Sequence, residues 1–109
     1  MNILIEYLYR DAGNNKIWGE VIFSNKMNFD VSILKANIKN ELIDGEFFIA
    51  EDVCLPSLYF VRHDEELDHG WHEYFSIKQT ANCSNDYLNR DINDFIRMLK
   101  FSKLRVTQS

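Results

Sequence analysis

The sequence predicts an α+β fold in which a mostly antiparallel sheet of about five strands packs with two helices, in the order ββαβββα. Apolar residues alternate with polar ones in several short segments and recur at helical spacing in two others. Helical segments are few and separated from the runs of strands, which is typical of the α+β class. The chain has 109 residues, 46% of them hydrophobic, and this suits a single globular domain spanning residues 1–109.

The N-terminal part of the chain predicts a β-hairpin. Residues 3–9 and 17–24 both alternate, and residues 11–16 between them are rich in the Asp, Gly and Asn that tight turns favour. Both strands also carry apolar residues on their second face. The hairpin is therefore expected to be covered on both sides or to lie centrally in the sheet.

A helix is expected to begin with Asp30 or Ser32 as its N-cap and to end at Asp44-Gly45. Its apolar stripe consists of Val31, Leu34, Ile38 and Leu42. Three further strands are predicted at residues 46–50, 57–61 and 71–80. A last helix is predicted after Ser84 as N-cap, with Asp86 in its first turn and with an apolar stripe of Leu88, Ile92, Phe95 and Leu99 widened by Ile96.

Charge is distributed unevenly along the chain. The formal net charge is −5, so nucleic acid is an unfavourable partner for the domain as a whole. The ten residues from Asp64 to Glu73 contain five carboxylates and no Lys or Arg, whereas no acid follows Asp94. Such polarity is typical of a solvated loop with cations near a helix C-terminus, or of a surface that steers a charged partner.

Compartment and redox state follow from what the sequence contains. The apolar start of the chain is interrupted by Glu6 and lacks the basic region of a signal peptide, and no apolar run approaches the roughly 20 residues of a membrane span. Two cysteines do not make a disulfide framework. We therefore expect a cytoplasmic protein in which Cys54 is a small core residue and Cys83, just before the predicted last helix, is the better placed of two weak reactive-thiol candidates.

All three histidines lie within ten residues, at His63, His69 and His72, among carboxylates. Imidazole and carboxylate together are ligands for transition metals, so this segment is a candidate metal site. The spacing matches neither a structural zinc pattern nor a metalloprotease signature, and His69 and His72 need not converge if a strand begins at residue 71. Solvated histidines in a polar loop are the ordinary alternative, and no other cofactor is expected.

Residues 42–51 and 66–73 resemble segments of small uncharacterised bacterial proteins, in a likeness that covers most of residues 5–75. The resemblance implies no activity, cofactor or site residue.

The leading hypothesis is a small acidic bacterial or phage protein that binds another protein, as immunity proteins, antitoxins and inhibitors do, rather than an enzyme. Its binding residues would be Asp64, Glu65, Glu66 and Asp68, with Trp71 as an apolar anchor. The alternatives are a metal-dependent hydrolase that uses the histidine segment 63–73, and a structural subunit that forms an obligate oligomer by burying its aromatic residues.

Overall fold

The computed structural model describes residues 1–58 and 71–107. Its elements are β1 (Asn2–Arg10), β2 (Lys16–Phe23), α1 (Val31–Asn40), β3 (Phe47–Ile49), the 3-10 helix η1 (Glu51–Val53), β4 (Trp71–Thr80) and α2 (Ile92–Thr107). The α+β class and the antiparallel sheet are confirmed. No helix in the described part of the chain is long and apolar enough to cross a membrane.

The sheet has the strand order β2-β1-β4-β3, and all of its pairings are antiparallel. β1 is therefore a central strand, but β2 is an edge strand, so the expectation that the hairpin lies centrally in the sheet holds for only one of its two strands. In the hairpin turn, a carboxylate oxygen of Asp11 accepts a hydrogen bond from the backbone N–H of Asn15 at 2.8 Å. Asn14 takes a positive φ of 65°, which Asn tolerates better than most residues.

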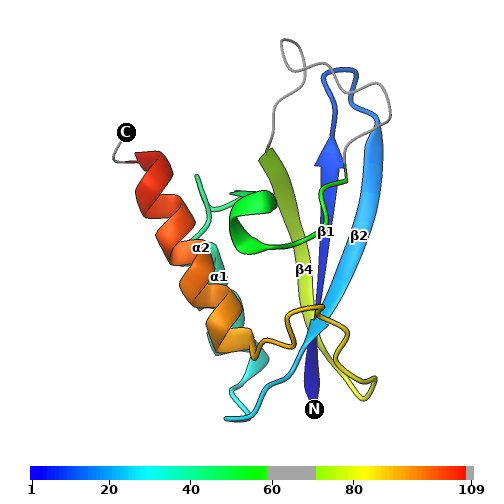
Figure 1. The fold of residues 1–109 in the computed structure, drawn as a ribbon, viewed down its shortest axis with the longest axis vertical. Helices are drawn as coiled ribbons and strands as arrows, with labels where there is room; N and C mark the ends of the chain where they lie inside the picture. The colour runs from blue at the N-terminus through cyan, green and yellow to red at the C-terminus, as the bar shows by residue number, and fades with distance from the viewer. Residues whose placement is uncertain (59–70, 108–109) are drawn as a thin grey trace.

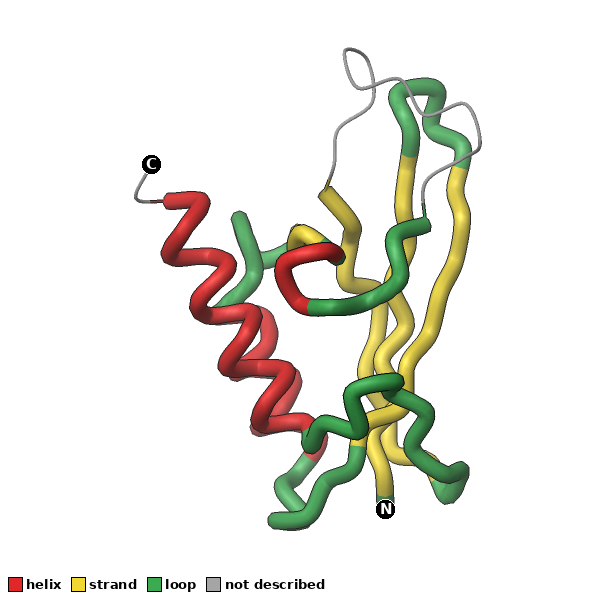
Figure 2. Tube along the Cα trace, in the orientation of Figure 1, coloured by secondary structure: helices red, strands yellow, loops and turns green. Residues whose placement is uncertain are grey.

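α1, η1 and α2 all lie against the same face of the sheet (Figures 1 and 2). The core between these two layers takes one set of alternate residues from each strand, such as Ile3, Ile5 and Tyr7 of β1, together with Leu34 and Ile38 of α1. Phe23 of β2 stacks on Phe95 of α2 with ring centroids 4.6 Å apart. Over the second face of the sheet, residues 1–58 and 71–107 place no helix, and we call it the outer face.

The segment after η1 is held close to the inner face of the hairpin. The hydroxyl of Tyr7 donates to the carbonyl of Pro56 at 3.0 Å, and burial raises the pKa of this phenol to about 12. A Cβ atom on Gly19 would lie 3.0 Å from side-chain atoms of both Tyr7 and Leu58. Glycine at position 19 therefore lets the side chain of Leu58 pack directly onto the strand, and any larger residue there would have to displace Leu58 or Tyr7.

The prediction of about five strands is wrong for the described residues, which contain four. The strand expected at residues 46–50 is present as β3, but the strand expected at 57–61 does not begin at Ser57 or Leu58. The backbone N–H of Leu58 donates to the imidazole Nε2 of His72 at 3.0 Å, so it is not available for a strand ladder. Residues 59–61 lie outside the described part of the chain.

The last helix begins at Ile92, and the prediction of Ser84 as its N-cap is wrong. Its N-cap is Asp91, whose carboxylate accepts from the backbone N–H of Asn93 at 3.2 Å. The carboxylate of Asp94 in turn accepts from the backbone N–H of Asp91 at 3.2 Å, which completes a reciprocal capping box. Asp91 also accepts from the hydroxyl of Ser24 and the backbone N–H of Lys26, and so fixes the start of α2 to the end of β2.

The prediction that Asp86 lies in the first turn of the last helix is wrong, because α2 begins at Ile92. Asp86 instead forms a buried ion pair with Arg90. The two side chains meet in a bidentate arrangement with both N···O distances at 2.9 Å. The guanidinium also donates to the carbonyls of Val53 and Cys54 at the end of η1 and to the sulfur of Met98. The guanidinium carbon of Arg90 also lies over two aromatic rings, 5.5 Å from the centroid of Phe23 and 5.8 Å from that of Phe95.

We predict that Asp86→Asn destabilises the protein by about 3–5 kcal/mol, because it leaves the buried guanidinium without its counter-charge. Chemical denaturation at neutral pH measures this loss. Lys78→Gln is the matched control, since it breaks the exposed Lys78–Glu6 pair and should cost under about 1 kcal/mol. Equal losses in the two variants would contradict a special role for the buried pair.

The same pair predicts a direction of pH dependence. Burial alone would raise the pKa of the Asp86 carboxyl, but the hydrogen bonds and charge of Arg90 outweigh it and lower that pKa below its ordinary value of 3.8. The stability that this group contributes is therefore fully present above pH 3.8 and is lost as the pH falls through the lowered folded-state value. The difference in the free energy of unfolding between wild type and Asp86→Asn should stay constant as the pH falls to about 3.8 and should narrow below pH 3.8. A gap that narrows at neutral pH would contradict this assignment.

Candidate functional site

The outer face of the sheet carries two aromatic pairs at its surface. The first consists of Trp18 on β2 and Phe75 on β4, whose ring centroids lie 4.8 Å apart in an edge-to-face arrangement. Because β1 runs between these two strands, the rings meet across the central strand. Leu8 of β1, the register partner of Trp18, is only 3% exposed, whereas the two rings are 50% and 56% exposed.

A β-bulge in β4 places Phe75 on this face. The register between β1 and β4 shifts after Glu6, so that Phe75 and Ser76 together oppose Glu6 and both lie on the outer face. Ile77 then returns to the core opposite Ile5. Phe75 and Ile77 are two residues apart and would share a face in a regular strand, but the bulge places them on opposite faces.

The second aromatic pair consists of Phe47 on β3 and Trp71 on β4, with ring centroids 5.6 Å apart. Phe47 is the register partner of Glu73 and Ile49 is that of Trp71, so the two rings meet diagonally between neighbouring strands. Both residues are partly exposed. We call Trp18, Phe47, Trp71 and Phe75 the aromatic face.

Ion pairs separate the aromatic residues on the outer face. Nε of Arg10 lies 2.8 Å from a carboxylate oxygen of Glu73, which raises the pKa of Arg10 above its ordinary value. Nζ of Lys78 lies 3.2 Å from Glu6, and Ser76 donates to the same carboxylate at 3.0 Å. These hydrogen bonds, that of Lys78 first, lower the pKa of Glu6. The charges beside the aromatic face are thus largely neutralised by one another.

Of the binding residues predicted from the sequence, only Trp71 lies in the described part of the chain, where it belongs to the aromatic face. Asp64, Glu65, Glu66 and Asp68 lie outside it. Chain connectivity alone links that acidic segment to the aromatic face, because Trp71 is the first residue of β4.

Among the predicted metal ligands, His63 and His69 lie outside the described residues, and His72 lies on the inner side of the sheet, opposite to Trp71. The imidazole of His72 is fully buried, with the rings of Tyr7, Tyr9 and Phe48 within 6.1 Å of it, centroid to centroid. Its Nε2 accepts the N–H of Leu58, so this lone pair is not available to a metal. Within residues 1–58 and 71–107, no group of three or more His, Cys, Asp and Glu side chains could hold a metal ion.

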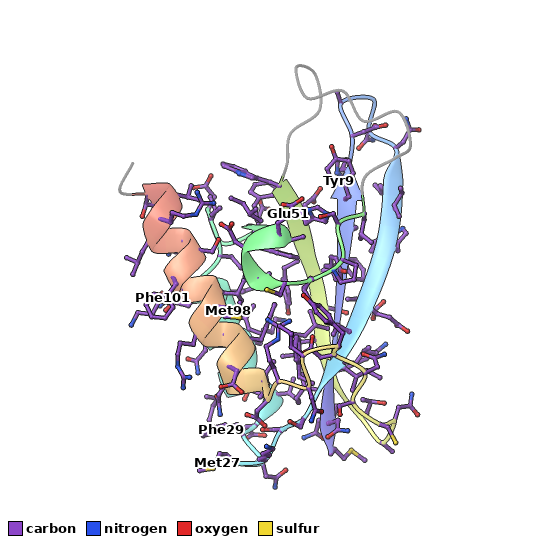
Figure 3. The ribbon with its side chains drawn as sticks, in the orientation of Figure 1. Tyr9, Met27, Phe29, Glu51, Met98 and Phe101 are labelled. Atoms are coloured by element: carbon purple, nitrogen blue, oxygen red, sulfur yellow. The ribbon has the colours of Figure 1, made fainter. Side chains whose placement is uncertain are left out.

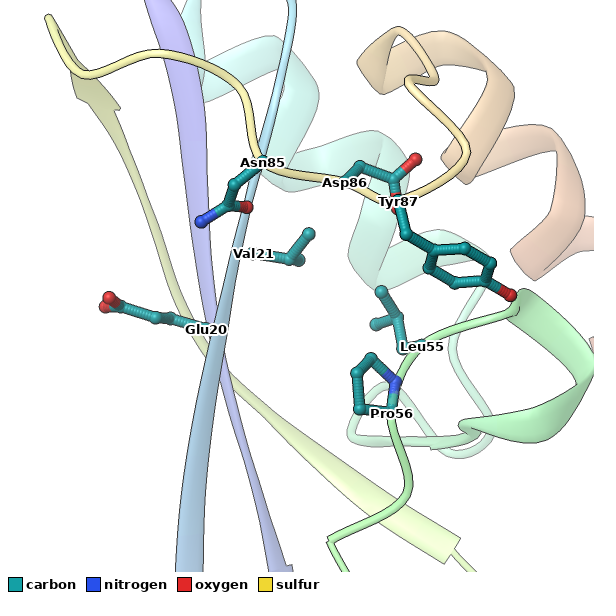
Figure 4. A pocket seen from close by; sticks show the side chains of 7 residues that line it. All are labelled: Glu20, Val21, Leu55, Pro56, Asn85, Asp86 and Tyr87. Carbon is teal, nitrogen blue, oxygen red and sulfur yellow. The ribbon is translucent and has the colours of Figure 1, made fainter.

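A shallow pocket of about 200 Å³ lies beside the edge of β2 (Figure 4). Val21, Leu55, Pro56 and Tyr87 form its apolar lining, and its polar lining comes from Glu20, Asn85 and Asp86. Asn85 accepts from the backbone N–H of Ile22 and donates from its own backbone N–H to the Ile22 carbonyl, while Asp86 holds Arg90. Two of the three polar groups are therefore occupied in maintaining the fold, and the pocket offers no set of groups for catalysis.

The cysteines do not form a reactive centre. Cys54 ends η1 in a left-handed conformation with φ of 56° and is half-buried rather than a core residue. Its hydrogen bond with the hydroxyl of Tyr87 raises the pKa of that exposed phenol. Cys83 is exposed, and α2 begins nine residues after it, so the reason for expecting an activated thiol there no longer holds.

Trp18, Phe47 and Phe75 were not selected from the sequence as binding residues. The available signal was compositional: the chain has more aromatic residues than two short helices can cover. The identity of the uncovered ones depends on the strand order and on the bulge, which sequence alternation does not reveal.

Comparisons with known proteins add no similarity from which a function could be inferred, since no family model, curated protein or solved structure matches the chain.

We predict that Trp18 and Phe75 are energetically coupled although they lie on strands that do not pair with each other. A double-mutant cycle on Trp18→Ala and Phe75→Ala, measured by chemical denaturation, should give a coupling energy of about 0.5–1.5 kcal/mol. A cycle on Trp18→Ala and Phe101→Ala, which is on the far side of the molecule, should be additive. Additivity in both cycles would mean that the two rings do not meet over Leu8.

Proposed function

We propose that this chain is a cytoplasmic protein that acts by binding another protein through the outer face of its sheet. The single observation that carries the proposal is the aromatic face, which none of the described helices covers. Trp and Arg are the residues that most often dominate binding energy at protein interfaces, and both occur here, at Trp18, Trp71 and Arg10.

The charge pattern supports a partner that is basic next to an apolar patch. The chain is acidic, and its carboxylate-rich segment from Asp64 onward leads directly into Trp71. Such a segment would accelerate association with a basic surface and help to set its orientation. The aromatic rings would then supply most of the affinity, because the ion pairs between them are already satisfied within the sheet.

The geometry of His72 gives no support to the alternative of a metal-dependent hydrolase, because its Nε2 is occupied and its ring is buried in the core. A structural subunit that assembles with copies of itself would use the same aromatic face. We retain this alternative as an outcome of the experiment.

The test is native mass spectrometry of the tagged protein isolated gently from its host. We expect a stoichiometric second protein, and we expect Trp71→Ala and Phe75→Ala each to weaken its binding by roughly thirtyfold or more, the effect of removing a hot spot worth about 2 kcal/mol. Tyr87→Ala removes an aromatic side chain that is more exposed and lies away from the outer face, so it is the control and should bind normally. A spectrum of homo-oligomers alone would favour the structural subunit, and a partner that depends on Tyr87 would refute the proposed surface.

The acidic segment has its own prediction. Reversing charge in the double variant Asp64→Lys/Asp68→Lys should slow association with the identified partner and flatten its salt dependence, while dissociation changes little. Stopped-flow or biolayer measurements at low and high salt separate these rates. Association that is unchanged at low salt would exclude a steering role for the segment.

A further inference from the structure

The C-terminal half of α2 carries a second surface, on the opposite side of the molecule from the aromatic face. Met98, Phe101, Ser102 and Arg105 follow one another at helical spacing and line a cavity of about 290 Å³ together with Asp52 of η1. Phe101 lies on the side of α2 that faces away from the sheet (Figure 3). The ring is 63% exposed, although the stripe of α2 at Phe95 and Leu99 is fully covered by the core.

The cavity has an apolar base and a polar rim. The thioether of Met98 and the ring of Phe101 supply the apolar atoms, and the carboxylate of Asp52 forms the rim by pairing with Arg105 and by accepting from the hydroxyl of Ser102 at 2.8 Å. A volume of about 290 Å³ above an apolar base is large enough to take one large apolar side chain.

The surroundings of the cavity are cationic in a protein that is acidic overall. No Asp or Glu follows Asp94 in the sequence, and Arg97 and Lys100 are exposed on the turns of α2 that flank Phe101. Arg97 makes an exposed ion pair with Asp94 at 3.4 Å, which a partner's carboxylate can replace at little cost. Leu104, 41% exposed, extends the apolar surface by one further turn. Lys103 is oriented differently, because its ammonium donates to the carbonyl of Asn40 at the end of α1.

We propose that this surface of α2 binds an acidic peptide segment of a partner protein, which inserts one apolar side chain into the cavity beside Phe101 and places its carboxylates near Arg97 and Lys100. Charge complementarity selects an acidic occupant, and the cavity selects one with a protruding apolar group. This site is independent of the outer face and would act whether or not that face binds a partner.

The shape of the surface argues against the two other classes of anionic partner. An anionic membrane would contact Phe101 and Leu104 but has no side chain to fill a cavity next to them. A nucleic acid would need a larger cluster of cations than Lys100 and Arg97, of which Arg97 is already paired with Asp94, and it would bring its phosphates to a domain of net charge −5.

The experiment is selection of random dodecapeptides displayed on phage against the full-length protein, followed by fluorescence anisotropy with the selected peptides. We expect enriched peptides to combine several Asp or Glu with one large apolar residue. Phe101→Ala should weaken their binding roughly tenfold or more, because Phe101 would be a residue that dominates the binding energy. Lys100→Glu should weaken binding at low salt and much less at high salt, because salt screens the interaction between charges. Because Phe101 is exposed, Phe101→Ala should leave the thermal midpoint nearly unchanged.

Two matched controls are available. Phe75→Ala removes an equally exposed ring from the outer face, and Ile33→Ala removes an exposed apolar side chain from α1, so neither should alter peptide affinity. Peptides that are neutral or basic, peptides whose binding depends on Phe75 rather than Phe101, or the absence of any enrichment would overturn the proposal. Binding to phosphatidylserine vesicles that depends on Phe101, without peptide binding, would overturn it in favour of a membrane.

Discussion

The buried ion pair between Asp86 and Arg90 is the interaction on which the arrangement of the two layers depends. A guanidinium has five N–H donors, and in Arg90 all five have acceptors: two bonds go to Asp86, two to carbonyls at the end of η1 and one to the sulfur of Met98. η1 is too short to satisfy its own terminal carbonyls, so the arginine performs the function of a C-cap. One side chain thereby joins the loop before α2, the turn after β3 and the helix itself.

This interaction lies between the layers that give the molecule two different surfaces. Arg90 joins η1 to α2 on the side of the sheet that every described helix covers. Over the other face, the described residues place only the side chains of the sheet itself. The meeting of Trp18 and Phe75 above Leu8 accomplishes this at the centre of the sheet. On the opposite side, the fixed position of η1 against α2 forms the cavity beside Phe101.

The sequence predicted the helices and strands that follow from a local pattern. It did not predict features that depend on contacts between residues far apart in the chain. Strands β1, β2 and β4, and α1 with its stripe at Leu34 and Ile38, follow from periodicity. Asp86 and Arg90 are four residues apart, a spacing that also suits an exposed pair on a helix, and only the carbonyls of a distant turn reveal that the pair is buried. The capping box of Asp91 and Asp94 was the local signal for the true start of α2. For the candidate site, Trp71 was predicted, whereas Phe75 depends on a bulge that the alternation of β4 hides.

The arrangement of charge bears on whether a chain with two binding surfaces would associate with itself. A basic helix on one side and an acidic, aromatic surface on the other could join copies head to tail, in an open chain that symmetry does not close. On the described part of the outer face, however, Arg10 is paired with Glu73 and Lys78 with Glu6, so these four charges cancel in pairs. The basic surface of α2 in another copy therefore gains little electrostatic energy at that face. Internal pairing of this kind leaves the aromatic rings available to a partner with its own apolar surface, while it weakens the attraction between copies of the chain.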